Sequence, residues 1–142
     1  MFKKASELKI TPKEHAALIT VMGWLKDGSL REGPGGGFDM SDACGFSACG
    51  TVACIGGWVY LAMQGLKFDV GPLDRDARIE ARMYVAEDKT EALHDLYYPW
   101  NIGFTKWETI TASEAATAIA NFLTSGDPSW DFVVAERTGE PA

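Results

Sequence analysis

Residues 43–66 read ACGFSACGTVACIGGWVYLAMQGL, the longest stretch of the chain without a charged side chain. Its second half predicts a helix from Val52 to Gln64, with Thr51 as the N-cap residue and Gly65 at the end. A helix without charges is expected to be buried on nearly all sides. This helix is therefore the predicted centre of the fold.

The same stretch is long enough to cross a bilayer, so a membrane span has to be weighed against a core helix. Glycines interrupt it, including Gly56 and Gly57 within the predicted helix, and no basic cluster flanks it to set an orientation. Together with Ala53, those two glycines leave one side of the helix without bulk, so a neighbouring helix can approach closely. We expect a buried core helix and no membrane insertion.

Helix-start signals divide the rest of the chain. Thr11 and Thr111 are each followed three residues later by glutamate, the capping-box pattern. Helices are predicted over 12–27, 74–86, 88–97 and 112–125, with one more turn around Trp130. The expected fold is mainly α, a compact bundle of four to five helices around the buried uncharged helix, with long irregular loops. Residues 1–133 are expected to form a single domain and 134–142 a flexible tail.

Two of these helices share a sequence pattern. Residues 10–19 and 110–119 match at the isoleucine, the threonine, the glutamate, an alanine and a second isoleucine, and an Asp-x-Ser follows each helix at 27–29 and 127–129. One interpretation is a pair of equivalent helices in a pseudo-symmetric core. The other is convergence on good capping and alanine-rich helices, because a repeat architecture needs sustained self-similarity.

The predicted helix over 74–86 carries Ile79, Met83 and Ala86 at helical spacing on one apolar face. Three arginines share another side of it: Arg75, Arg78 and Arg82. They indicate either a basic contact stripe or an exposed face whose charges pair with neighbouring carboxylates.

Composition excludes some function classes. The 142 residues hold 13 Lys and Arg against 20 Asp and Glu, a net charge of −7. This balance repels a phosphate backbone, so no nucleic-acid partner is expected, and it favours basic partners. Charges recur too often in residues 1–10 for a signal-peptide core, which predicts a cytoplasmic location with reduced thiols. No cofactor is expected.

Three cysteines recur at a period of five, at Cys44, Cys49 and Cys54. One interpretation is a metal site of these three thiolates with His94 or a carboxylate, although the spacing lacks the close ligand pairs of zinc sites. A second is a nucleophilic Cys49, activated at the start of the predicted helix with His94 as its base. The third treats them as small buried hydrophobic residues.

The stretch Cys49-Gly50-Thr51-Val52-Ala53-Cys54 resembles the nucleophile region of papain-like peptidases, in which a cysteine opens a buried helix. Extended to Trp58, it resembles a Cys-Gly-Thr-x-x-Cys-x-x-Gly-Trp segment of small uncharacterised bacterial and phage proteins. That group has no assigned activity. The resemblance implies a phage or mobile-element context, in which small acidic proteins bind and block host proteins.

Two loops are the expected contact regions. The glycine-rich loop over 29–42 is expected to be a flexible surface loop and contains Phe38 and Asp39, while the aromatic loop contains Trp100, Phe104 and Trp107. Exposed aromatic side chains in loops are typical of binding surfaces, although they also fill cores. We expect a non-enzymatic protein that binds another protein, such as an accessory factor or inhibitor of a host system. The alternative is a thiol-dependent hydrolase that uses Cys49 and His94.

Overall fold

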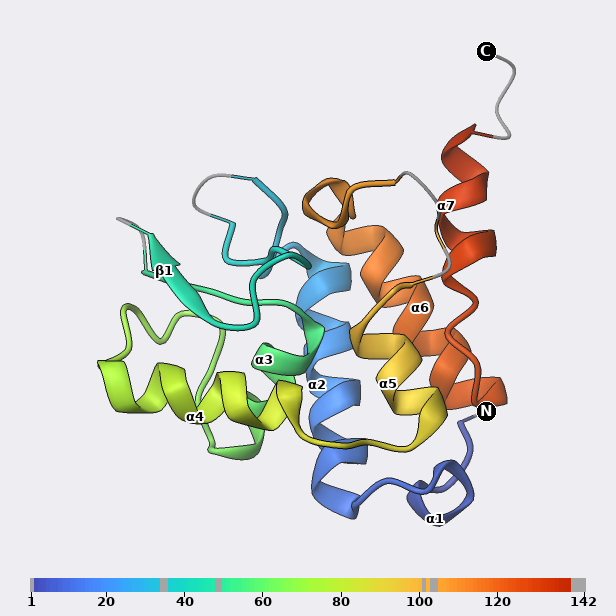
Figure 1. Ribbon diagram of the computed structural model, residues 1–142, viewed down its shortest axis with the longest axis horizontal. Coiled ribbons are helices and arrows are strands. Elements are labelled where there is room, and N and C mark those ends of the chain that lie inside the picture. The colour runs from blue at the N-terminus through green and yellow to red at the C-terminus, as the bar shows by residue number, and fades with distance from the viewer. Residues whose placement is uncertain (1, 34–35, 48–49, 101, 103–104, 139–142) are drawn as a thin grey trace.

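The computed structural model describes residues 2–33, 36–47, 50–100, 102 and 105–138, and its regular structure is mostly helical. The elements in chain order are α1 (Ala5–Leu8), α2 (Pro12–Asp27), β1 (Gly45–Ser47), β2 (Gly50–Val52), α3 (Ile55–Met63), α4 (Arg75–Ala86), α5 (Glu91–Tyr97), the 3-10 turn η1 (Trp107–Thr109), α6 (Ala112–Ser125) and α7 (Trp130–Thr138). Figure 1 shows α2 in the middle, with α3 and α4 on one side and α5, α6 and α7 on the other. The prediction of a mainly α fold is confirmed, and the uncharged helix α3 is largely buried as expected, although α2 and not α3 lies in the middle of the bundle (Figure 1).

The two longest helices, α2 and α6, pack together in opposite directions. Glu32, just after α2, accepts a hydrogen bond at Oε1 from the backbone N–H of Ala112, 2.8 Å away, at the start of α6. At the other end, the N–H of Lys3 donates to the carbonyl of Leu123 at 2.7 Å. The beginning of each helix therefore lies beside the end of the other.

Both helices have the predicted ends. The side chain of Glu14 accepts from the N–H of Thr11 at 2.9 Å, and Glu114 accepts from Thr111 at the same distance. Each helix ends at a glycine with a left-handed backbone, which a glycine adopts without strain. The repeated sequence therefore falls on two equivalent helices that pack against each other.

The central helix starts later than the sequence predicts. Residues from Gly50 to Val52 form β2, which pairs antiparallel with β1, and α3 begins at Ile55 with Cys54 at the N-cap position. Thr51 does not cap the helix, because its hydroxyl donates to the carbonyl of Gly71. The predicted start at Val52 is therefore wrong, while the predicted burial of the helix is confirmed.

The glycines of α3 allow close approach, as predicted, but not by a helix backbone. A Cβ on Gly56 would lie 3.0 Å from a methyl of Val85 and 3.1 Å from the ring of Tyr97. A Cβ on Gly57 would lie 1.9 Å from the carbonyl oxygen of Ala43, in the loop before β1. Gly57 is therefore where a loop backbone rests directly on the core helix.

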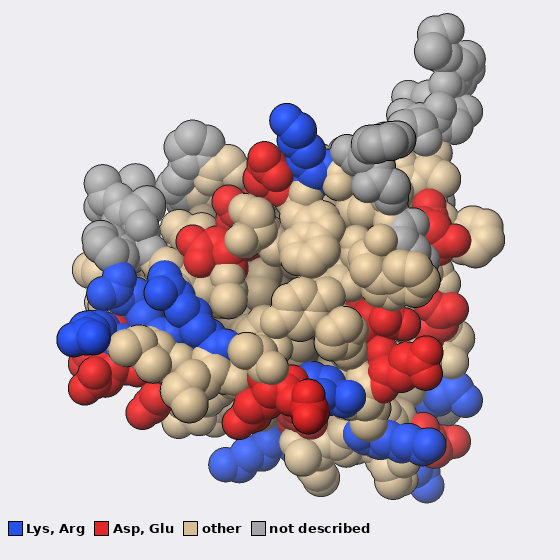
Figure 2. Space-filling model, viewed as in Figure 1, with Lys and Arg blue, Asp and Glu red and all other residues tan. Residues whose placement is uncertain are grey.

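Helix α4 turns an unexpected face to the core. Its buried residues are Ala81 and Val85, whereas Ile79 is 37% exposed and Met83 is 61% exposed. The apolar face read from the sequence therefore faces solvent. Small side chains are buried instead because α4 packs closely against α3. Figure 2 shows Lys and Arg side chains gathered over α4 on this side of the molecule.

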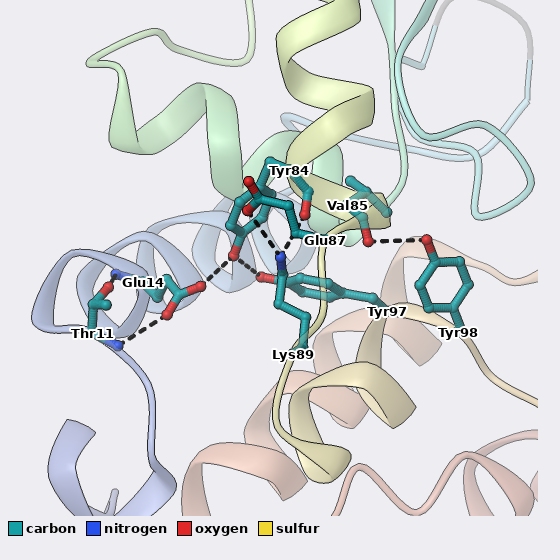
Figure 3. Close-up of polar contacts among 8 residues, drawn as sticks. All are labelled: Thr11, Glu14, Tyr84, Val85, Glu87, Lys89, Tyr97 and Tyr98. Carbon is teal, nitrogen blue, oxygen red and sulfur yellow. Dashed lines mark hydrogen bonds and ion pairs between the residues drawn. The ribbon is translucent and has the colours of Figure 1, made fainter.

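A half-buried polar network joins three helices (Figure 3). The hydroxyl of Tyr84 donates to Oε2 of Glu14 at 2.6 Å and lies 2.7 Å from the hydroxyl of Tyr97. Lys89 lies 4.0 Å from the centre of the Tyr84 ring, donates to the carbonyl of Tyr84, and forms an ion pair with Glu87 at 3.6 Å. The network ties α4 to α2 and α5.

Two further element boundaries differ from the predictions. Helix α5 begins at Glu91 with Thr90 at the N-cap position, so it starts three residues later than the predicted start at residue 88. Helix α7 continues through Thr138, and Val134 is 6% exposed, so the expected boundary at residue 133 falls inside this helix. Trp130 anchors α7, because its indole N–H donates to the carbonyl of Leu96 at 3.1 Å.

Candidate interaction surface

Helix α5 presents the candidate site. Its residues Leu93, Leu96 and Tyr97 are buried, which fixes the orientation of the helix. His94 and Asp95 lie on its other side, with side chains 53% and 32% exposed. The helix ends at Tyr98 and Pro99 follows it. The chain then passes through irregular structure to η1.

Three aromatic side chains contact one another in a row from α5 to η1. The ring centres of His94 and Tyr98 lie 4.9 Å apart, and those of Tyr98 and Trp107 lie 6.1 Å apart. Hydrogen bonds fix the positions of two of these side chains. The hydroxyl of Tyr98 donates to the carbonyl of Val85 at 3.0 Å, and the indole N–H of Trp107 donates to the carbonyl of Pro99 at 3.1 Å. We call His94, Tyr98, Trp107 and Trp100 the aromatic surface.

Trp100 is the exposed tryptophan of this surface. It is 68% exposed, yet its indole N–H donates to Oδ1 of Asp95 at 2.8 Å, and its backbone N–H donates to the carbonyl of Tyr98 at 2.7 Å. The bond to Asp95 holds the ring in one orientation on the outside of the protein. A fixed, exposed tryptophan can bury a large apolar area on a partner at a low entropic cost.

Carboxylates border the aromatic surface. An open hollow of about 630 Å³ is lined by Lys9, Thr90, Glu91, Ala92, Asp95, Gly126, Asp127 and Pro128. Asp95 belongs both to this hollow and to the hydrogen bond with Trp100. Figure 2 shows Asp and Glu side chains over α5, beside an uncharged area in the middle of this face. The arrangement places an apolar anchor next to negative charge.

The predicted binding residues have different outcomes. Trp107 contacts the ring of Tyr98 and donates to the carbonyl of Pro99, and the backbone N–H of Trp100 donates to the carbonyl of Tyr98. Phe104 lies outside the described residues. Phe38 is 2% exposed, so its assignment to a binding surface is wrong: it is a core residue paired by a backbone bridge with Ala53.

Asp39 and the glycine-rich loop are tied to the core. Asp39 accepts hydrogen bonds from the N–H and the hydroxyl of Ser41, at 2.9 and 2.6 Å, which makes it a turn residue. Gly36 is buried, and the carbonyl of Gly37 accepts the indole N–H of Trp58 at 2.7 Å. Residues 36–40 of this loop are therefore packed against the protein, whereas Arg31, Glu32 and Gly33 are exposed.

Sequence reasoning missed two parts of the surface. The sequence predicts His94 as a base or metal ligand, whereas its ring lies against that of Tyr98, four residues further on, a spacing that brings side chains of a helix together. The role of Asp95 carries no such signal, because it depends on where the chain goes after Pro99.

The two cysteines with described positions are buried, and their surroundings make the thiols unreactive. Cys44 is 0% exposed and Cys54 is 3% exposed, and burial raises the pKa of both thiols, that of Cys54 to about 11. Cys54, not Cys49, occupies the helix N-cap, so the argument for an activated Cys49 at the start of α3 is wrong. Cys49 itself lies outside the described residues.

Neither the metal site nor the nucleophile–base pair gains support. In the described ranges, no group of three His, Cys, Asp or Glu side chains could hold a metal ion. His94 stacks on Tyr98 and lies 3.9 Å from Asp95, on the outside of α5. Nor does any helix among the residues with assigned positions have the length and apolar character needed to cross a membrane.

Comparison of the chain with known proteins found no similar protein. No protein-family model matches the chain, and neither the curated proteins nor the solved structures gave a match.

Proposed function

We propose that this chain is a cytoplasmic protein that acts by binding another protein through the aromatic surface. The observation that carries the proposal is Trp100, which is 68% exposed and held by Asp95. Tryptophan is enriched among the residues that contribute most to protein–protein affinity. The rings of Tyr98 and Trp107, whose centres lie 6.1 Å apart, belong to the same surface.

The charge around the site indicates a basic partner. Three carboxylates, those of Glu91, Asp95 and Asp127, outnumber the single ammonium group of Lys9 in the lining of the hollow beside Trp100, and the whole chain carries a net charge of −7. Lys or Arg side chains of a partner would enter the hollow while an apolar group covers the indole. The partner we expect is therefore a protein face that combines basic residues with an apolar pocket.

The resemblance of the cysteine segment to small phage and bacterial proteins supports a more specific role. Proteins in that context act as accessory factors or as inhibitors of host systems. We include such a role in the proposal. It requires no reaction by the chain itself, which fits the buried thiols of Cys44 and Cys54.

Affinity capture tests the proposal with a matched pair of variants. The tagged chain, a Trp100→Ala variant and a Phe132→Ala variant are used to capture proteins from a lysate of the source cell, and captured proteins are quantified by mass spectrometry. Phe132 is 72% exposed on α7, so the two variants remove similarly exposed aromatic rings.

We expect at least one basic protein to be enriched by the wild type and by Phe132→Ala and to be lost with Trp100→Ala. Its recovery should also fall as salt is added, since the carboxylates contribute. Equal recovery with all three baits would reject the aromatic surface as the binding site. No enriched protein in any bait would reject the proposed function.

A further inference from the structure

The outer face of α4 combines apolar side chains with two charged edges. Ile79 and Met83 are 37% and 61% exposed, and Ala86 is exposed one turn further on. At 100° per residue these three side chains form one stripe along the helix. An exposed apolar stripe on a helix is a candidate contact surface.

The charges on the two edges of this stripe have opposite signs. Arg75 and Arg82 follow one edge, and Asp76 and Glu80 follow the other. The ion pairs recorded within the described residues, Lys89 with Glu87 and His94 with Asp95, do not use these two arginines. On the acidic edge, Oε2 of Glu80 accepts a hydrogen bond from the hydroxyl of Tyr60 at 3.0 Å. Its other carboxylate oxygen, together with the exposed Arg75 and Asp76, can still meet charges from outside the chain.

The fold does not require this face. Helix α4 is held by its opposite side, where Ala81 and Val85 are buried and the hydroxyl of Tyr84 is hydrogen-bonded. Figure 1 shows α4 along the outside of the bundle. Arg82 donates from Nε to the carbonyl of Cys44 at 2.7 Å, and a guanidinium has further donors left for a second acceptor.

The charges on the two edges indicate which partner binds the apolar stripe. We propose that the stripe binds the same stripe of a second copy of this chain, with the two α4 helices parallel about a two-fold axis. In a parallel pair the basic edge of one helix faces the acidic edge of the other, so Arg75 lies near Asp76 and Glu80 of the second copy. An antiparallel pair would instead bring like-charged edges together. The surface is small, so the dimer is weak and depends on ionic strength.

Sedimentation equilibrium of the full chain, from micromolar to millimolar concentration, tests this dimer. Ile79→Asp should abolish association. Ile19→Asp is the matched control, because Ile19 lies on α2 and is 38% exposed, close to the 37% of Ile79. Circular dichroism shows that each variant is folded. The control should associate like the wild type.

A charge exchange tests the orientation of the helices. Arg75→Glu alone places like charges together and should weaken association about tenfold. The double variant Arg75→Glu with Glu80→Arg recreates opposite charges across the interface and should recover wild-type association at least in large part. Added salt should weaken the wild-type dimer.

Three results would overturn the proposal. A wild-type chain that stays monomeric at every concentration has no such interface. Association that survives Ile79→Asp does not use the stripe on α4. Association that becomes stronger with Arg75→Glu indicates antiparallel helices. None of these results bears on capture of a partner through Trp100, which is tested separately.

Discussion

The hydroxyl groups of Tyr84 and Tyr97 lie 2.7 Å apart, and the carboxylate of Glu14 is the second partner of the Tyr84 hydroxyl at 2.6 Å (Figure 3). Tyr97 is 1% exposed, so its hydroxyl depends on Tyr84 for a partner. A single phenol group thus satisfies a buried hydroxyl on α5 and connects it to the first turn of α2. This contact holds α5, and with it the aromatic surface, against the rest of the bundle.

Removal of that phenol group is expected to destabilise the protein. Tyr84→Phe leaves the Tyr97 hydroxyl buried without its partner, which should lower the free energy of unfolding by about 1–3 kcal/mol. Tyr60→Phe is the control, because it removes an exposed hydrogen bond to Glu80 and should change stability by less than about 0.5 kcal/mol. Urea denaturation measures both. Equal effects of the two variants would show that the network does not stabilise the fold.

Substitution by alanine is expected to lower the stability of the protein at one glycine and to raise it at another. Gly57→Ala would place a Cβ 1.9 Å from the carbonyl oxygen of Ala43, so the loop must move and stability should fall by about 2 kcal/mol or more. Gly23, in the middle of α2, has nothing within 4 Å of such a Cβ, and Gly23→Ala should stabilise by about 0.5–1 kcal/mol. Thermal unfolding separates the cases. A tolerated Gly57→Ala would contradict the close contact of the loop with α3.

Stability is expected to decline at alkaline pH. Burial raises the pKa of Cys54 from 9.0 to about 11 and also raises those of Tyr84 and Tyr97. Each of these groups has a folded-state pKa above its unfolded value. The unfolded chain therefore releases protons first as pH rises, and the free energy of unfolding falls above about pH 9. The contribution of Cys54 is intact below that pH and is lost as pH rises to 11.

Denaturation series at several pH values measure this decline. Cys54→Ala removes one titrating group, so between pH 9 and 10 the variant should lose stability more slowly than the wild type. The comparison uses slopes, because the variant also loses packing at every pH. Identical slopes would contradict a buried, neutral thiol at this position.

Thiol labelling should distinguish buried cysteines from a reactive site. In a Cys49→Ser variant the remaining thiols are Cys44 and Cys54, both nearly inaccessible. They should react with a thiol reagent on the order of 100-fold more slowly in the folded protein than in denaturant. Rapid reaction of either thiol without denaturant would show an open site that the fold described here does not have.

Local signals were sufficient for much of the fold. The capping boxes at Thr11 and Thr111 and the glycines that end both helices are short-range features, so α2 and α6 could be predicted closely. The start of α3 could not. Thr51 and Val52 suit a strand as well as a helix, and pairing with β1 decides between them.

Tertiary packing decided the remaining differences. Ile79 and Met83 face solvent because Ala81 and Val85 pack closely against α3. The spacing of apolar residues within α4 does not reveal this packing. The burial of Phe38 likewise depends on a backbone bridge with a residue far along the chain. At the candidate site, the two tryptophans could be predicted from composition, but their connection through Tyr98 and Asp95 depends on the path of the loop.

The central claim is that Trp100 anchors a basic partner protein. Titration of the captured partner against purified wild type, Trp100→Ala and Phe132→Ala, followed by calorimetry, measures this directly. We predict that Trp100→Ala raises the dissociation constant by about 30-fold or more, the loss of at least 2 kcal/mol typical of an anchoring residue, while Phe132→Ala leaves it unchanged. A dissociation constant unaffected by Trp100→Ala would contradict the account.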